Sequence, residues 1–137
     1  FLSSTDDGMQ LFTMDPNGEN RKQISNVEKG IDGFLFSPDE TKILLIRNIK
    51  YGKASTDVYP DLDKADVKIV DDLMYKHWDH WVTEIPHPFI GNVSEDGISD
   101  IVDIMEGEPY ECPMLPFGGT ESFSWSPDSK TIAYSSR

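Results

Sequence analysis

FLFSPDETKILLI, residues 34–46, is the stretch that decides the fold, and its pattern returns as FSWSPDSKTIAYS, residues 123–135. Each copy starts with a short aromatic run, passes through Ser-Pro-Asp and ends with a second apolar run that is partly β-branched. Such runs are typical of strands, while Pro fixes φ and the Asp carboxylate accepts hydrogen bonds from the turn backbone. Each copy therefore predicts a β-hairpin. The turn residues are Ser37, Pro38 and Asp39 in the first copy and Ser126, Pro127 and Asp128 in the second.

The spacing of the two copies gives a second clue to the architecture. From Ser37 to Ser126 the offset is 89 residues. This is twice about 44 to 45, close to the period of about 40 to 45 residues for one four-stranded propeller blade. Two arrangements fit the offset: two blades with a degenerate middle copy, or one blade enlarged by an insertion. We favour the enlarged blade, because no third Ser-Pro-Asp lies midway, where residues 80–83 read HWVT.

The regions on either side of the first hairpin motif also predict strands. Residues 9–14 alternate as a strand, the Asn-Gly of residues 15–18 favours a turn, and residues 21–25 read as a return strand. Further on, residues 94–97 predict a hairpin turn, and Ile98, Ile101, Val102 and Ile104 predict an outer strand. Between them, Pro86 and Pro88 are expected to confine residues 82–93 to a sheet edge or a loop until Phe89.

Residues 51–82 depart from the strand pattern. A helix start is expected near Tyr59-Pro60-Asp61, where carboxylates crowd the first turn of residues 59–66. The apolar residues that follow recur at spacings of three and four, which favours a helix with one apolar and aromatic face. They are Val70, Leu73, Met74, His77, Trp78 and Trp81. Alternation at Val67 and Ile69 would instead suit a strand.

These patterns predict a mainly β chain: a partial β-propeller of about one enlarged blade plus two half blades, with a short helical insertion. Residues 1–30 would supply the outer strands of one blade. Residues 31–106 would form the enlarged blade with the insertion at 51–82, and residues 107–137 a connector and the inner hairpin of the next blade. The N-terminus has neither an initiator Met nor a basic leader, and the last strand lacks a neighbour, so we expect a segment of a longer protein.

The composition and the missing motifs exclude several classes of partner and site. With 25 acidic and 12 basic residues, the formal net charge of −13 argues against nucleic acid and anionic membranes as partners. The single cysteine, Cys112, allows neither an internal disulfide nor a thiolate metal site. No nucleophile elbow, His-Glu-x-x-His or phosphate-binding loop occurs, so we predict no catalytic residue, no metal and no cofactor in this chain.

The densest group of reactive side chains is His77, Trp78, Asp79, His80 and Trp81. On a helix His77 and His80 would share a face, a spacing compatible with a metal. We favour a packing or ligand-shaping role instead, in which both tryptophans pack against the sheets. Asp39 and Asp128 lack the neighbours of a calcium loop and are expected to cap their turns.

The chain resembles the β-propeller of bacterial prolyl oligopeptidase family (S9) serine peptidases, in particular the dipeptidyl-peptidase and acylaminoacyl-peptidase-like branch. The resemblance rests on the two Ser-Pro-Asp hairpins, on residues 73–81 between them, and on residues 117–128. Ser-Pro-Asp hairpins also occur in TolB-like propellers, whereas His-Trp-Asp-x-Trp between the two hairpins is more specific.

The resemblance implies a non-catalytic module. In that family a propeller caps an α/β-hydrolase domain and limits access to short peptides. The resemblance thus implies that the intact parent releases short peptides, in particular dipeptides, from oligopeptide N-termini, in the periplasm or after secretion. His77–Trp81 would then line the substrate entrance or pack. The alternative is a TolB-like protein-interaction module. In either case, unpaired strand edges favour self-association.

Overall fold

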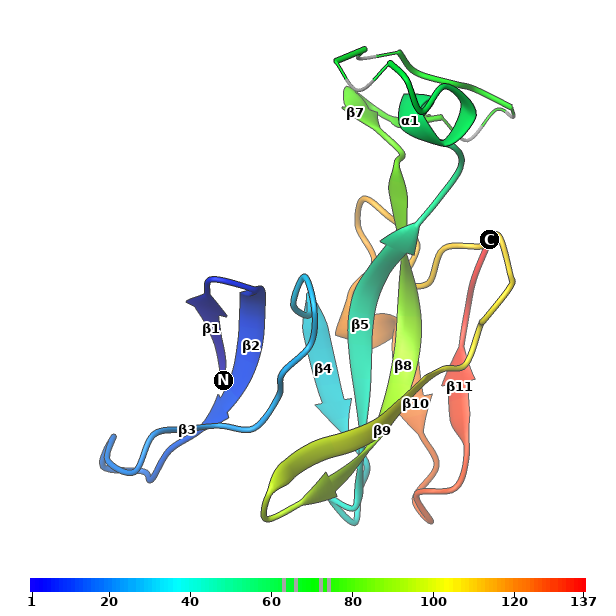
Figure 1. Cartoon of the computed structure of the whole chain (residues 1–137). Helices are drawn as coiled ribbons and strands as arrows, with labels where there is room; N and C mark the ends of the chain where they lie inside the picture. Colours follow the sequence, from blue (N-terminus) through cyan, green and yellow to red (C-terminus); the bar gives the residue numbers. More distant parts are fainter. Residues whose placement is uncertain (63, 66, 72, 74) are drawn as a thin grey trace.

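A computed structural model of the chain describes residues 1–62, 64–65, 67–71, 73 and 75–137 (Figure 1). Its centre is a four-stranded antiparallel sheet with the strand order β4-β5-β8-β9. The four strands are β4 (Gly33–Phe36), β5 (Lys42–Lys50), β8 (Glu84–Ser94) and β9 (Gly97–Asp103). The chain between the two Ser-Pro-Asp motifs supplies β5, β8 and β9 of this sheet, and residues 51–83 are an excursion between β5 and β8.

Smaller sheets flank the central one (Figure 1). On one side lie β1 (Leu2–Thr5), β2 (Gly8–Thr13) and β3 (Lys22–Gln23). On the other lie β10 (Phe123–Trp125) and β11 (Ile132–Tyr134), preceded by the short 3-10 helix η1 (Thr120–Ser122). Both predicted Ser-Pro-Asp hairpins, the strand pair around the Asn-Gly turn and the outer strand after residue 97 are confirmed. Strand β1 was not predicted.

Strand β5 joins two hydrophobic cores. Ile43 and Leu45 belong to the core shared with the first sheet, whereas Leu44 and Ile46 belong to the core shared with β10 and β11. Successive side chains of a strand point to opposite faces, so an unbroken apolar run indicates burial on both faces. The central sheet is therefore packed between its two neighbours.

The two Ser-Pro-Asp turns have the same hydrogen-bonding pattern. In the first, the Asp39 carboxylate accepts from the Ser37 hydroxyl at 2.7 Å and from the Thr41 backbone amide at 3.1 Å. In the second, Asp128 accepts from the Ser126 hydroxyl at 2.6 Å and from the Lys130 amide at 3.2 Å. Each Asp therefore holds its own turn closed.

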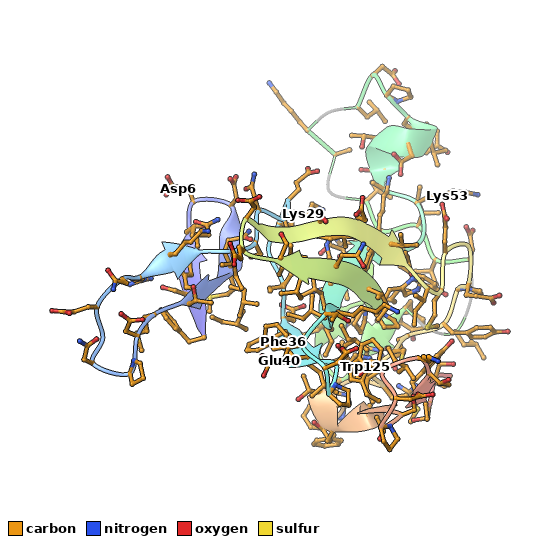
Figure 2. The ribbon with its side chains drawn as sticks, turned by 90° about the horizontal axis from the view of Figure 1, so that it is seen from below. Asp6, Lys29, Phe36, Glu40, Lys53 and Trp125 are labelled. Carbon is orange, nitrogen blue, oxygen red and sulfur yellow. The ribbon has the colours of Figure 1, made fainter. Side chains whose placement is uncertain are left out.

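The turns also touch each other, as do the strands before them. The Asp39 amide donates to the Ser129 hydroxyl at 3.1 Å, and the Trp125 indole donates to the Leu35 carbonyl at 3.2 Å. Figure 2 shows Phe36 and Glu40 of the first hairpin beside Trp125 of the second. The two copies of the motif thus lie next to each other on neighbouring sheets.

The hydrogen bonds of the first turn predict how the free energy of unfolding changes at low pH. Hydrogen bonds from Ser37 and from the amide and hydroxyl of Thr41 lower the pKa of Asp39 from its usual 3.8 to about 2. Because the folded state favours the charged form, this stabilisation is present above pH 3.8 and is lost as the pH falls towards 2. Replacing Asp39 by Asn should therefore flatten the decline of unfolding free energy over this range, measured by urea denaturation. The exposed Asp6→Asn is the surface-charge control, and parallel curves for wild type and Asp39→Asn would contradict the prediction.

The prediction that Pro86 and Pro88 lie at a sheet edge or in a loop until Phe89 is confirmed for the edge, because the β8–β9 ladder begins only at Phe89. Both lie within β8, which pairs with β5 along nine residues of each strand. The carbonyls of Pro86 and Pro88 accept from the amides of Cys112 at 2.8 Å and Ile104 at 3.2 Å. In an antiparallel strand the N and O of one residue point the same way, so the missing N–H groups face away from β5. The ladder with β5 therefore loses no donor.

The predicted helix within residues 51–82 is wrong in place and extent. The only helix among the described residues of this segment is α1 (Ser55–Val58), which ends before Pro60. The described residues of 67–81 contain an Ala54–Lys68 bridge and the two-residue strands β6 (Lys76–His77) and β7 (His80–Trp81) instead. Met74, expected on the helical face, lies outside the described residues. Over the part of the chain that is described, no helix is long and apolar enough to cross a membrane.

Candidate functional site

The excursion between β5 and β8 stands at one end of the central sheet (Figure 1). The β5–β8 ladder runs up to the pair Lys50 and Glu84, and the Tyr51 amide donates to the Thr83 carbonyl at 2.9 Å. The excursion therefore leaves and re-enters the fold at neighbouring positions. Lys50 also forms an ion pair with Asp57 of α1, which holds the helix over the end of the sheet.

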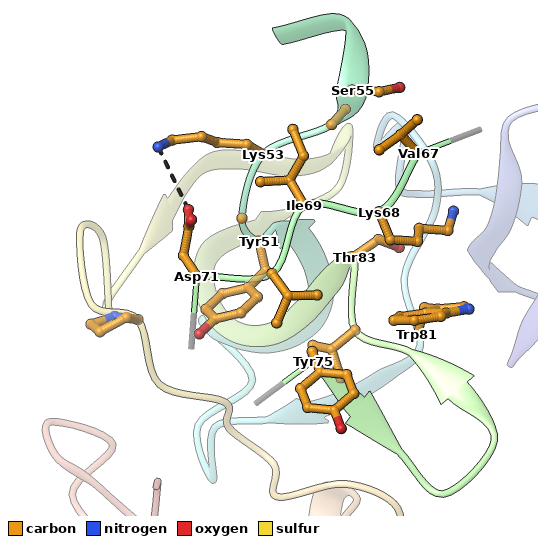
Figure 3. Close-up of a pocket in the computed structure, with 15 residues that line it drawn as sticks. Tyr51, Lys53, Ser55, Val67, Lys68, Ile69, Asp71, Tyr75, Trp81 and Thr83 are labelled. Carbon is orange, nitrogen blue, oxygen red and sulfur yellow. Dashed lines mark ion pairs between the residues drawn. The ribbon is translucent and has the colours of Figure 1, made fainter. Parts of the chain in front are cut away.

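A pocket of about 450 Å³ opens within this excursion (Figure 3). Its walls are mostly apolar and include Tyr51, Ile69, Tyr75 and Trp81. The Lys53 ammonium lies 3.5 Å from the Asp71 carboxylate among the lining residues. The volume falls within the range of small-molecule sites, and this pocket is one candidate binding site.

The predicted His-Trp-Asp-His-Trp cluster forms the tight hairpin β6–β7. His77 and His80 are a cross-strand pair, with Trp78 and Asp79 at the tip and φ of Trp78 at 51°. His80 Nε2 lies 3.3 Å from Asp79 Oδ1, and both side chains are exposed. Trp81 packs on Tyr75, with ring centroids 6.1 Å apart.

The expectation that both tryptophans pack against the sheets is not met. The side chain of Trp78 is 73% exposed, and Trp81 is also exposed. The Trp78 ring makes an edge-on contact with Phe117, with centroids 5.5 Å apart. Among the residues that the structure describes, no group of three or more His, Cys, Asp or Glu side chains could hold a metal ion.

A buried carboxylate fastens this hairpin to the rest of the molecule. Glu111 is fully buried, and its two oxygens accept from His77 Nε2 at 2.7 Å and from Arg137 Nε at 2.8 Å. Arg137 also donates through Nη2 to the Leu115 carbonyl at 3.2 Å. Glu111 thus joins the insertion, the connector after β9 and the chain beyond β11.

The sequence analysis missed Glu111, Arg137 and Phe117 as site residues. Nothing in the sequence distinguishes Glu111 from the other acidic residues of the chain, since its role depends on partners 34 and 26 residues away. Its neighbour Cys112 is a buried free thiol, and burial raises its pKa to about 11. Cys112 is therefore a core residue that stays protonated at neutral pH.

Comparison with known proteins adds the final observation. No protein-family model matches the chain. Over its full length it is 58% identical to dipeptidyl-peptidase 5 of Porphyromonas gingivalis and 37% identical to dipeptidyl-peptidase 5 of Porphyromonas endodontalis. A probable dipeptidyl-peptidase 5 of Aspergillus niger is 25% identical over 95% of the chain. The chain spans about a fifth of the length of these relatives, each time 20%. It is therefore similar from end to end to one fifth of proteins named dipeptidyl-peptidase 5.

Proposed function

We propose that this chain is a non-catalytic propeller segment of a prolyl oligopeptidase family serine peptidase, and that it gates the access of oligopeptides to a hydrolase domain elsewhere in the parent. The observation that carries the proposal is the 58% identity, along the whole chain, with a protein named dipeptidyl-peptidase 5. Identity at this level over every element favours the same place in the parent's architecture.

The packing of the sheets supports the propeller part of the proposal. In a propeller each four-stranded blade packs face to face against the blades before and after it. The sheet β4-β5-β8-β9 has four antiparallel strands in chain order and a core on each face. The Ser-Pro-Asp hairpin β10–β11 follows this sheet in the chain and shares a core with it, as the first two strands of a next blade would.

The gating part is supported by the position of residues 51–83. They project from one end of the sheet and carry a pocket of about 450 Å³ with aromatic walls. Binding and selecting residues are often on loops held by a rigid scaffold. In a parent whose hydrolase domain faces this end, the excursion would lie beside the path of the substrate.

A chimera tests the proposal. The aligned fifth of the Porphyromonas gingivalis relative would be replaced by this chain, and hydrolysis of a dipeptidyl chromogenic substrate measured. We expect kcat/KM to stay within about tenfold of the parent, which is about 1.4 kcal/mol in activation free energy. In a second chimera a short turn would replace residues 52–82, and we expect weaker discrimination between a short peptide and a long unfolded polypeptide.

One control and two possible outcomes make the test decisive. The isolated 137-residue chain should not hydrolyse the substrate, because no catalytic residue is assigned to it. A folded first chimera without activity would count against a peptidase segment and favour the TolB-like interaction module. Unchanged discrimination in the second chimera would contradict the gating role and leave the assignment to a peptidase segment standing.

The proposal also includes a periplasmic or secreted location for the parent, and self-association of the isolated chain through its exposed strand edges.

A further inference from the structure

The pocket shown in Figure 3, which we call the excursion pocket, has apolar walls that take no part in either hydrophobic core. They come from the start, the middle and the end of the excursion and include Tyr51, Ile69, Val70, Tyr75 and Trp81. None of these five side chains belongs to a core formed by the described residues. The sheets therefore pack without them, and their apolar surface is left for another purpose.

Several walls of the excursion pocket are open to solvent. Val70 is 48% exposed, Tyr75 is 43% exposed and Trp81 is 45% exposed. Single exposed apolar residues are ordinary, but apolar side chains gathered around a hollow mark a surface that a ligand covers. The volume of about 450 Å³ lies within the range of about 300 to 1,000 Å³ for pockets that enclose small ligands. The excursion pocket is therefore large enough for the side chains of a short peptide segment.

Two aromatic rings form one wall of the excursion pocket. The centres of the Tyr75 and Trp81 rings lie 6.1 Å apart, and the rings are tilted by 41°. Lys76, which is not among the described lining residues, places its ammonium 4.6 Å from the centre of the Trp81 ring. Two contacts thus hold the indole in place, and a ring ordered in advance loses little entropy when a ligand packs on it. A further ring can pack on such a wall in an offset or edge-on geometry.

The charges around the excursion pocket favour an uncharged ligand. The charged residues among its described lining are Lys53, Lys68 and Asp71. The Lys53 ammonium lies 3.5 Å from the Asp71 carboxylate, so these two charges compensate each other. Figure 3 shows the Lys68 side chain extending away from the Tyr51 ring. A charged ligand group would lose hydration on entering, and the paired Lys53 and Asp71 offer it little in return.

We propose that the excursion pocket binds an uncharged, apolar segment of an oligopeptide and seats an aromatic side chain against Tyr75 and Trp81. The choice of a peptide as the ligand rests on the proposed function, whereas the class of side chain follows from the lining. The excursion then does more than stand beside the path of the substrate. It favours peptides with aromatic or large aliphatic residues over peptides with charged residues at the same position.

The test is a titration of the 137-residue protein with three N-acetylated, C-amidated peptides, followed by tryptophan fluorescence and calorimetry. They are Ala-Phe-Leu-Ala and its charged counterparts Ala-Glu-Leu-Ala and Ala-Lys-Leu-Ala. We expect saturable binding of the apolar peptide, at least about tenfold tighter than either charged peptide, which is about 1.4 kcal/mol. Because apolar surface is buried and no ion pair forms, the heat capacity change should be negative and the affinity nearly independent of salt.

Variants of exposed residues locate the binding. Tyr75→Ala removes half of the aromatic wall and should weaken the apolar peptide by about tenfold or more. Val70→Glu places a carboxylate in the apolar lining and should weaken it at least as much. Matched controls, Tyr59→Ala and Val58→Glu, replace exposed residues of the same excursion that are not among the described lining residues, and they should bind as the wild type does. Circular dichroism verifies the fold of each variant.

Three results would overturn the proposal: no saturable binding of the apolar peptide, equal affinity for a charged peptide, or wild-type affinity in Val70→Glu or in a folded Tyr75→Ala variant. A fourth would replace the ligand. If sedimentation shows a dimer that Val70→Glu dissociates, and the apolar peptide does not bind, the occupant is a second copy of the chain.

The titration and the chimeras fail independently, because the peptides have blocked termini and no hydrolysis is measured. An active first chimera together with absent peptide binding would reject the excursion pocket as a peptide site and leave the peptidase assignment standing. Saturable, Val70-dependent binding together with an inactive first chimera would reject the proposed function and keep the site for apolar peptides.

Discussion

Replacing Leu44 by Ala is expected to lower the free energy of unfolding by about 3 kcal/mol, and replacing Leu45 by Ala should lower it by a similar amount. Both side chains are fully buried, yet they belong to different cores. Each substitution leaves a cavity that neighbouring side chains fill only in part. Urea denaturation followed by circular dichroism measures both effects.

The comparison of these two variants tests whether the central sheet is covered on both faces. In a sheet with one solvent-facing side, one of the two substitutions would change stability little. The exposed Val102 of β9 supplies the control, and Val102→Ala should change the free energy of unfolding by less than about 0.5 kcal/mol. A Leu44 or Leu45 variant as stable as this control would refute the two-sided packing.

The second large effect is expected from Glu111. Glu111→Ala removes the acceptor of both His77 and Arg137 and leaves their donors unpaired in a partly buried place. Because Arg137 is half exposed and keeps some access to water, we expect a loss of about 2 to 3 kcal/mol, somewhat below that for a fully buried pair. Urea denaturation again gives the free energy.

Glu108 gives a matched control, because it is an exposed Glu in the same connector. Glu108→Ala should have almost no effect. In a double-mutant cycle, Glu111→Ala and His77→Ala should couple by about 1 kcal/mol or more. Equal stabilities of the Glu111 and Glu108 variants, or a coupling near zero, would show that Glu111 does not fasten the hairpin.

Local turn chemistry explains what the sequence predicted well. The hairpins at Ser37 and Ser126 depend on contacts within a few residues, such as the bond from Ser37 to Asp39, and these are visible in the sequence. The same holds for the strand pair around Asn17-Gly18 and for the outer strand β9. Strand β1 was missed because its sequence, LSST, has little apolar pattern.

Other features depended on partners that the sequence does not name. The spacing of Val70, Leu73 and Trp81 is helical, yet all three side chains are exposed and none belongs to a core formed by the described residues. Periodicity predicts a helix only where one face has something to pack against. The two prolines of β8 do lie where the strand is paired on one side alone, as predicted, but the sequence does not tell that this one neighbour is β5.

The candidate site was predicted only in part. His77 to Trp81 were singled out as a group, and they lie together in the β6–β7 hairpin, but their partners were not found. Glu111, Phe117 and Arg137 meet them through long-range contacts; Glu111 and Phe117 are ordinary residues of an acidic, turn-rich connector, and Arg137 follows β11. Only the folded backbone brings them within reach.

The way the excursion leaves the sheet has an evolutionary consequence. Its two ends, Tyr51 and Thr83, are joined by a hydrogen bond, so they stay together whatever lies between them. For a flexible loop, doubling the length raises the entropy of closure by only about 0.6 kcal/mol. Segments of different length and chemistry can therefore replace one another here while the sheet beneath keeps its register, which lets selection change what the protein recognises without rebuilding its fold.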